Sequence, residues 1–174
     1  MASDDELVRQ AAAGDTDSAE QLVRRWSARV LAVCRSRVHH ADAAEDLAQE
    51  SLLRALRGLR TLADPEKFGP WICGIARRTC LDWLKDARRT EVSYDALPDP
   101  PHPPAAEEID VEASDRLMQE VASLPEAYRE TLMLYYSKNC TYEELAELLS
   151  VSAATVNVRL TKARKILRER LART

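Results

Sequence analysis

Basic residues crowd the last part of the sequence, and contact with phosphate is the chemistry that such a cluster supports. Between Ser152 and Thr174, seven Lys and Arg residues stand against a single acid, Glu169, which gives this segment a net charge of +6. A helix that is only solvated more often mixes both signs along its face. The excess of cations therefore indicates contact with DNA. The alternative is a helical hairpin whose basic face is merely solvated.

Two short helical patterns position this basic segment. Thr141 and Glu144 have the spacing of a capping box, which predicts that a helix begins there. Ser150 and Val151 interrupt its apolar pattern, and Ser152 is a favourable N-cap for the next helix. A helix, a tight turn and a second helix form a helix-turn-helix, in which the second helix enters the major groove of DNA.

The second helix of this pair has two faces. Its apolar residues recur at three- and four-residue steps and line one side: Val156, Leu160, Ala163, Leu167 and Leu171. The other side holds Thr155, Val158, Thr161, Lys162 and Lys165, with Asn157 and Arg159 beside them. On this side Lys can donate to guanine, Asn can pair with adenine, and the methyl groups of Val and Thr can contact thymine.

The composition of the whole chain favours helices. Apolar residues make up 45% and aromatic residues 5% of the 174, with one Phe and four Gly, which is more typical of an all-α protein than of sheets. The net charge is −4, but residues 91–115 hold eight acids and no Lys or Arg. The rest of the chain has 25 bases and 21 acids, so the acidic total is no objection to DNA binding.

A proline-rich stretch divides the chain. Five of the eight prolines lie in residues 98–104, which excludes a helix there and predicts an extended acidic linker over residues 92–113. We therefore expect two small helical domains, over residues 1–91 and 114–174, as compact lobes on an extended tether.

The first of these domains contains two clear helical patterns before residue 60. Helical spacing runs over residues 4–38, with a break expected at Gly14-Asp15. Asp42 and Glu45 have the spacing of an N-terminal cap, so the next helix is predicted to begin at Asp42. The outer face of that helix presents Asp46, Gln49, Glu50 and Arg54.

The segment from residue 67 to residue 89 interleaves bases with aromatic residues. Asp64 and Pro65 predict an N-cap followed by proline at the first helical position. Phe68 and Trp71 then accompany Lys67, Arg77, Arg78, Lys85, Arg88 and Arg89. Such a mixture suits single-stranded nucleic acid, because cations hold the backbone and rings stack on unpaired bases. Alternatively, Phe68 and Trp71 belong to the core and the bases are solvated.

No pattern indicates a metal, a cofactor or a membrane segment. His39 and His40 lack a third ligand nearby, and the four cysteines (Cys34, Cys73, Cys80 and Cys140) show no zinc-ligand spacing. Cys73 and Cys80 lie about 10 Å apart along one helix, too far for a disulfide. We expect four reduced packing cysteines in a soluble, cytoplasmic protein, since no stretch approaches the roughly 18 apolar residues of a membrane span and the acidic N-terminus is not a signal peptide.

The order of these parts resembles the extracytoplasmic-function (ECF) sigma factors of bacterial RNA polymerase. Three stretches carry the likeness: DAAEDLAQESLLRAL at 42–56, FGPWICGIARRTCLDWLKDARR at 68–89, and the segment from LPEAYRETLMLYY at 124 to the helix-turn-helix that ends at 171. The resemblance implies a protein without catalytic residues that binds core RNA polymerase, at the clamp helices of its largest subunit and at its flap. It also implies recognition and melting of promoter DNA, and control by an anti-sigma factor.

Carried over by position, the resemblance assigns roles to particular residues. The clamp would be bound by Asp46, Gln49, Glu50 and Arg54, which could otherwise be only a solvated acidic face. In the minus-ten element, Arg77, Arg78, Lys85, Arg88 and Arg89 would hold the DNA backbone, and Lys67, Phe68 and Trp71 would flank or support a base pocket. The minus-thirty-five element would be read by the helix from Ser152, through Ser152, Thr155, Asn157, Val158, Arg159, Thr161, Lys162 and Lys165.

Two features qualify these assignments. The family often has Gly at the position of Ala154, and a base followed by Ser where Asn157 and Val158 stand, so the promoter sequence stays open. The linker acids Glu107, Glu108 and Asp110 could mimic a nucleic-acid backbone inside the cationic channels of the polymerase.

Two other functions are alternatives to that of a sigma factor. A helix-turn-helix regulator with an N-terminal sensor or dimerisation module would bind duplex DNA without polymerase. A metal-dependent nuclease could use Asp42, Glu45, Asp46 and Glu50, but these lie on one helix without Glu-x-x-His or other ligands nearby.

Overall fold

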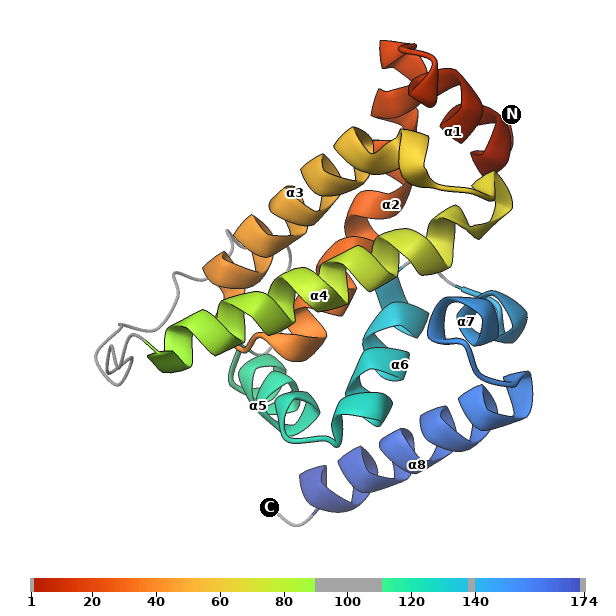
Figure 1. Ribbon diagram of the computed structural model, residues 1–174. Helices are drawn as coiled ribbons and strands as arrows, with labels where there is room; N and C mark the ends of the chain where they lie inside the picture. The colour runs from red at the N-terminus through yellow and green to blue at the C-terminus, as the bar shows by residue number, and fades with distance from the viewer. Residues whose placement is uncertain (1, 90–110, 138–139, 173–174) are drawn as a thin grey trace.

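The computed structural model describes residues 2–89, 111–137 and 140–172, and the regular structure of these residues is entirely helical (Figure 1). The first half forms α1 (Asp4–Ala12), α2 (Thr16–Arg37), α3 (Ala41–Gly58) and α4 (Phe68–Arg89), with 3-10 turns at Leu59–Thr61 and Pro65–Lys67. The second half forms α5 (Val111–Ala122), α6 (Glu126–Ser137), α7 (Tyr142–Leu149) and α8 (Ala153–Leu171). The predicted all-α class is confirmed.

Local signals set several of the helix boundaries where the sequence predicts them. Gly14 has φ of +105°, a left-handed conformation that is costly for residues with a side chain, and it separates α1 from α2. The Asp15 carboxylate then caps α2 by accepting from the backbone N–H of Ser18 at 3.0 Å. Asp64 accepts from the backbone N–H of Glu66 at 3.0 Å, just before α4.

The predicted cap at Asp42 is wrong. Helix α3 begins one residue earlier, at Ala41, with His40 as its N-cap and no side-chain capping bond. Asp42 therefore lies in the first turn, where its carboxylate favours the positive end of the helix dipole without capping it. Glu45 is not part of a capping box either, because it forms an ion pair with Arg35 of α2 at 2.7 Å.

The boundary between the two halves is only partly described. Helix α5 begins at Val111, inside the span predicted as linker. The rest of that span, with Glu107, Glu108 and Asp110, lies outside the described residues.

The two halves pack against each other. Helix α2 contacts α1, α3, α4 and also α6, while α6 contacts α8, and α7 contacts both α4 and α8. In Figure 1, α6 lies between the α2–α4 layer and α8, which runs along the opposite edge of the molecule. Buried apolar residues from both halves, such as Val33 and Leu134, belong to one continuous core. The described lobes are therefore in contact, where the sequence suggested two separate bodies on a tether.

Candidate promoter and polymerase interface

Helix α8 is held by the turn that the sequence predicts. Thr141 and Glu144 form both bonds of the capping box, at 2.8 and 3.2 Å, and fix the start of α7. Ser150 ends α7 in the left-handed region at φ of 53°. The Ser152 hydroxyl then accepts from the backbone N–H of Thr155 at 3.1 Å and starts α8. Helices α7 and α8 are thus fixed at both sides of a three-residue turn.

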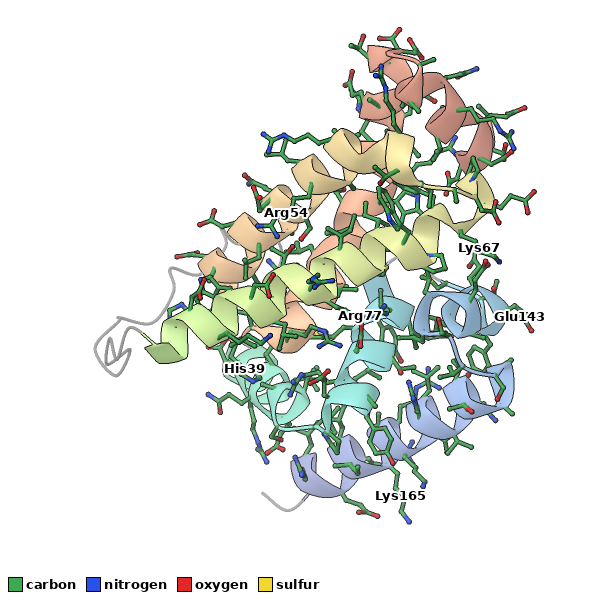
Figure 2. The ribbon with its side chains drawn as sticks, in the orientation of Figure 1. His39, Arg54, Lys67, Arg77, Glu143 and Lys165 are labelled. Carbon is green, nitrogen blue, oxygen red and sulfur yellow. The ribbon has the colours of Figure 1, made fainter. Side chains whose placement is uncertain are left out.

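The two faces of α8 lie as the apolar spacing predicts. Val156, Leu160, Ala163 and Leu167 are buried against α6 and α7. Asn157, Thr161, Lys162 and Lys165 are exposed together on the outer side, and the apolar Val158 is 49% exposed among them. Thr155 and Arg159 are half-buried at the edges of this face. Lys165 points into solvent at the edge of the molecule in Figure 2. The side chains predicted to read DNA are therefore accessible on one face of α8.

Helix α3 presents the acidic face predicted to bind polymerase. Asp46 and Gln49 are exposed, and Glu50 accepts from Arg54 Nε at 2.7 Å one turn away. Both side chains of that ion pair are more than 40% exposed, so the pair adds little to stability. Either residue can therefore leave the pair to bind another molecule at little cost. Arg54 also donates to the Thr79 hydroxyl of α4 at 3.4 Å, so it lies on the side of α3 that meets α4 (Figure 2).

The two aromatic residues at the start of α4 lie at different depths. Phe68 is 2% exposed and meets the Trp26 ring edge to face, with centroids 5.6 Å apart. Trp71 is half-buried, tilted against Phe68 at 6.0 Å. Phe68 thus cannot contact a base in this conformation. Trp71 retains an exposed portion.

The cations of α4 and of the turn before it divide into an exposed group and a group engaged in contacts between helices. Arg78 and Lys85 are exposed. Lys67 forms an ion pair with Glu147 of α7 at 2.9 Å, and this hydrogen bond raises the pKa of Lys67 (Figure 2). Arg77 is bound to α6 and α7. Arg88 and Arg89 belong to α4, but their side chains lie outside the described set.

Two family models match this arrangement of helices. Sigma-70 region 2 matches residues 22–90, and sigma-70 region 4 matches residues 114–167. Among curated proteins, the ECF RNA polymerase sigma factor SigM of Bacillus subtilis is 31% identical over 134 residues, which cover 72% of this chain and 77% of SigM. The chain belongs to the ECF sigma factors. The RNA polymerase sigma factor YlaC of the same bacterium is 30% identical over 91% of this sigma factor and 94% of its own length.

A solved structure shares the fold of this sigma factor. It is described as a co-crystal structure of the sigma factor RpoE in complex with the anti-sigma factor NepR from Bartonella quintana. The two chains superpose with a TM-score of 0.64 and 22% identity, over 88% of this chain and 96% of the other. The family assigns this chain to promoter recognition and transcription initiation, and the family members are not enzymes.

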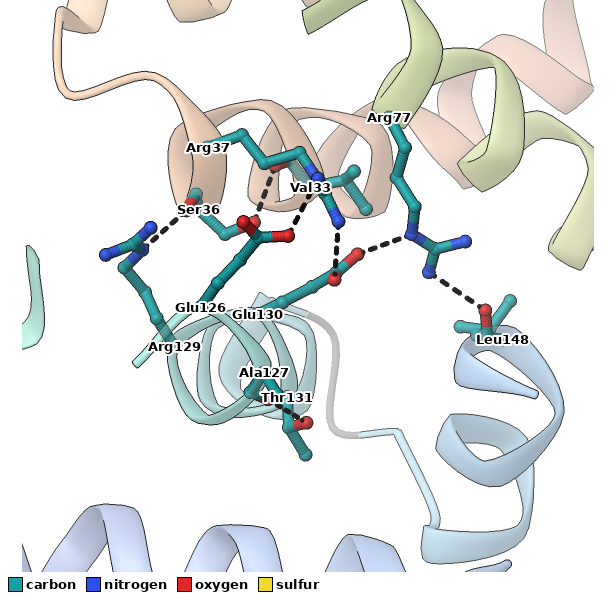
Figure 3. Close-up of polar contacts among 10 residues, drawn as sticks. All are labelled: Val33, Ser36, Arg37, Arg77, Glu126, Ala127, Arg129, Glu130, Thr131 and Leu148. Carbon is teal, nitrogen blue, oxygen red and sulfur yellow. Dashed lines mark hydrogen bonds and ion pairs between the residues drawn. The ribbon is translucent and has the colours of Figure 1, made fainter. Parts of the chain in front are cut away.

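The contacts between regions 2 and 4 of the sigma factor involve residues that sequence reasoning missed. Glu130 of α6 is 5% exposed and binds Arg77 of α4 at 2.7 Å and Arg37 of α2 at 3.2 Å (Figure 3). Arg37 also pairs with Glu126 at 2.8 Å. The sequence does contain one indication that Glu130 is buried. Glu130 stands four residues before Leu134, so both residues lie on the same buried face of the helix.

The cysteines of the sigma factor are buried free thiols, as predicted. Burial raises the pKa of the Cys73 thiol to about 12, which disfavours its reactive thiolate. Within the described ranges, no cluster of His, Cys, Asp and Glu could hold a metal ion. In the same ranges no helix is both long and apolar enough to span a membrane.

Proposed function

We propose that this sigma factor reads promoters through two separate surfaces, with residues 1–91 serving the minus-ten element and core polymerase, and residues 114–174 serving the minus-thirty-five element. Residues 92–113 join these units in the polymerase complex. The observation that carries the proposal is the exposed outer face of α8, fixed by the Ser152 cap and backed by a buried apolar seam.

On that face, the side chains have the groups that read base edges. Lys162 offers a donor suited to guanine, and Asn157 offers the donor and acceptor pair suited to adenine. Val158 and Thr161 present methyl groups that fit the methyl of thymine. Ser152, Thr155, Arg159 and Lys165 surround these four and position the helix by contact with phosphates.

The minus-ten surface lies on α4 and the turn before it. Exposed Arg78 and Lys85 are suited to hold the backbone of a melted strand, and Arg88 and Arg89 extend this series along the chain. Trp71 stacks on or borders an unpaired base, and buried Phe68 keeps Trp71 in place. Trapping unpaired bases in this way offsets the cost of melting without any chemical step.

The polymerase surface lies on α3. Asp46, Gln49 and Glu50 stand at i, i+3 and i+4, so one helix face carries two carboxylates and an amide toward a basic coiled coil. Arg54 releases Glu50 on docking and contributes its own contact. The chain works in the cytoplasm, and an anti-sigma factor covers its polymerase-facing surfaces. The related RpoE structure is likewise a complex with an anti-sigma factor.

Transcription in vitro with core RNA polymerase on a library of promoter fragments tests the proposal. Transcript starts should map downstream of two shared sequence elements at a fixed spacing, and only when the sigma factor and core enzyme are both present. If the purified chain fails to associate with core polymerase but binds a duplex site unaided, the chain is an ordinary helix-turn-helix regulator and the proposal is wrong.

A further inference from the structure

The contact between the two halves uses Arg77, a residue that the family resemblance predicts to hold the DNA backbone at the minus-ten element. Arg77 of α4 donates from Nε to Glu130 at 2.7 Å and from Nη2 to the backbone carbonyl of Leu148 at 3.0 Å. Its guanidinium thus points toward α6 and α7 (Figure 3). Glu130 offers Arg77 a carboxylate in place of a phosphate.

The Glu130 carboxylate is the centre of this contact. It is buried between two arginines from the other half, because Arg37 of α2 approaches from one side and Arg77 of α4 from the other. A buried carboxylate needs such partners, since an unpaired charge at a dry interface is strongly unfavourable. Removing Glu130 would also leave Arg77 without its carboxylate partner, while Arg37 would keep Glu126.

Further arginine contacts tie the same two surfaces together. Arg129, one position before Glu130, donates from Nε to the backbone carbonyl of Ser36 at the end of α2. Arg37 reaches Glu126 as well as Glu130, so one face of α6, which carries Glu126, Arg129 and Glu130, is held by α2. The Nε of Arg37 is buried without an acceptor among the described residues. The cluster is therefore polar and incompletely satisfied, which suits a contact that must open.

We propose that Glu130 is an intramolecular lock, which holds regions 2 and 4 together through Arg37 and Arg77 and keeps Arg77 from DNA until core polymerase separates the two halves. This inference rests on the proposed minus-ten surface of α4 and on the place in it that the family resemblance predicts for Arg77. A lock that leaves about 1–10% of the molecules open lowers the apparent affinity for DNA by about 10- to 100-fold. The free protein would thus be prevented from occupying promoters on its own.

Three variants of the full-length protein separate the lock from the DNA contact. Glu130→Gln and Arg37→Gln break the lock and keep Arg77, whereas Arg77→Gln breaks the lock and removes the proposed DNA contact. Glu20→Gln is the control, because it breaks an exposed ion pair with Arg24 inside α2. Two readouts are used: the radius of gyration from small-angle scattering, and the affinity for a single-stranded minus-ten oligonucleotide without polymerase.

We expect Glu130→Gln and Arg37→Gln to expand the protein and to bind the oligonucleotide about tenfold or more tightly than the wild type. Arg77→Gln should expand the protein without this gain, and Glu20→Gln should match the wild type. Equal compactness and equal affinity in wild type, Glu130→Gln and Arg37→Gln would overturn the lock.

Two other outcomes are also informative. If all three variants expand and Arg77→Gln also binds the oligonucleotide more tightly, the contact through Glu130 does hold the two halves together. In that case Arg77 is not part of the DNA surface. Circular dichroism checks that helix content is kept. If Glu130→Gln loses helix content, Arg37→Gln decides the matter, because that variant weakens the contact between α2 and α6 without removing the buried Glu130 carboxylate.

Discussion

Arg77 of α4 and Glu130 of α6 form an ion pair of 2.7 Å that joins the two helical units of this sigma factor. Glu130 is almost fully buried, so the pair lies in the shared interface. The same arginine is one of the cations predicted to hold promoter DNA. One side chain therefore has two possible partners, and which it binds depends on whether the two units are together.

Replacing Asp46 and Gln49 together by Ala should weaken binding to core polymerase. Both side chains are exposed on α3, so their loss removes contacts without disturbing the core. Hydrogen bonds to charged groups are worth about 1.5–3 kcal/mol, which predicts a loss of about tenfold or more in a quantitative pull-down. Glu20→Ala with Gln21→Ala removes an equally exposed acid and amide from α2 and should change nothing. Unchanged affinity in the α3 variant would argue against the clamp assignment.

Lys162→Ala should lower transcription from some promoters far more than from others. A side chain that reads a base contributes about 1–3 kcal/mol at the promoters that carry the matching base pair. The measurement is transcription in vitro across a promoter library, with Arg168→Ala, also exposed on α8, for comparison. A uniform loss over all promoters would make Lys162 a phosphate contact.

Ser152→Ala should destabilise the start of α8. Its hydroxyl accepts the backbone N–H of Thr155 at 3.1 Å, and loss of such a cap costs about 1 kcal/mol. Chemical denaturation monitored by circular dichroism measures the change. Thr161→Ala, in the exposed interior of the same helix, removes a hydroxyl without removing a cap and should cost nothing. Equal stability of Ser152→Ala and wild type would show that the capping bond does not hold the helix start.

Gly69→Ala should destabilise the protein, and Gly74→Ala should not. A Cβ atom at Gly69 would lie 2.5 Å from Cη2 of Trp26 and 3.0 Å from Cδ2 of Leu148, so α2 and α7 would have to move. Overpacking of this kind costs about 1–3 kcal/mol. At Gly74 nothing lies within 4 Å of the added atom, and alanine is favoured by about 0.5–1 kcal/mol inside a helix. Thermal melting of the two variants should shift in opposite directions.

Helix boundaries and faces could be predicted from the sequence alone, because the interactions that set them act between residues a few positions apart. The capping box at Thr141, the break at Gly14 and the buried seam of Val156, Leu160, Ala163 and Leu167 all depend on near neighbours. Two boundaries were exceptions: α5 begins at Val111, inside the predicted linker, and the predicted cap at Asp42 is absent. There the helix begins one residue earlier, and Glu45 binds Arg35 of another helix instead.

Only the tertiary structure decided which predicted site residues are accessible. The pattern of aromatics and bases in α4 is the same whether Phe68 faces a base or the core, and packing against Trp26 places it in the core. Likewise, nothing near Arg77 in the sequence indicates that its partner stands 53 residues later, at Glu130. Pairings of this kind depend on how distant helices pack, and local periodicity carries no information about that.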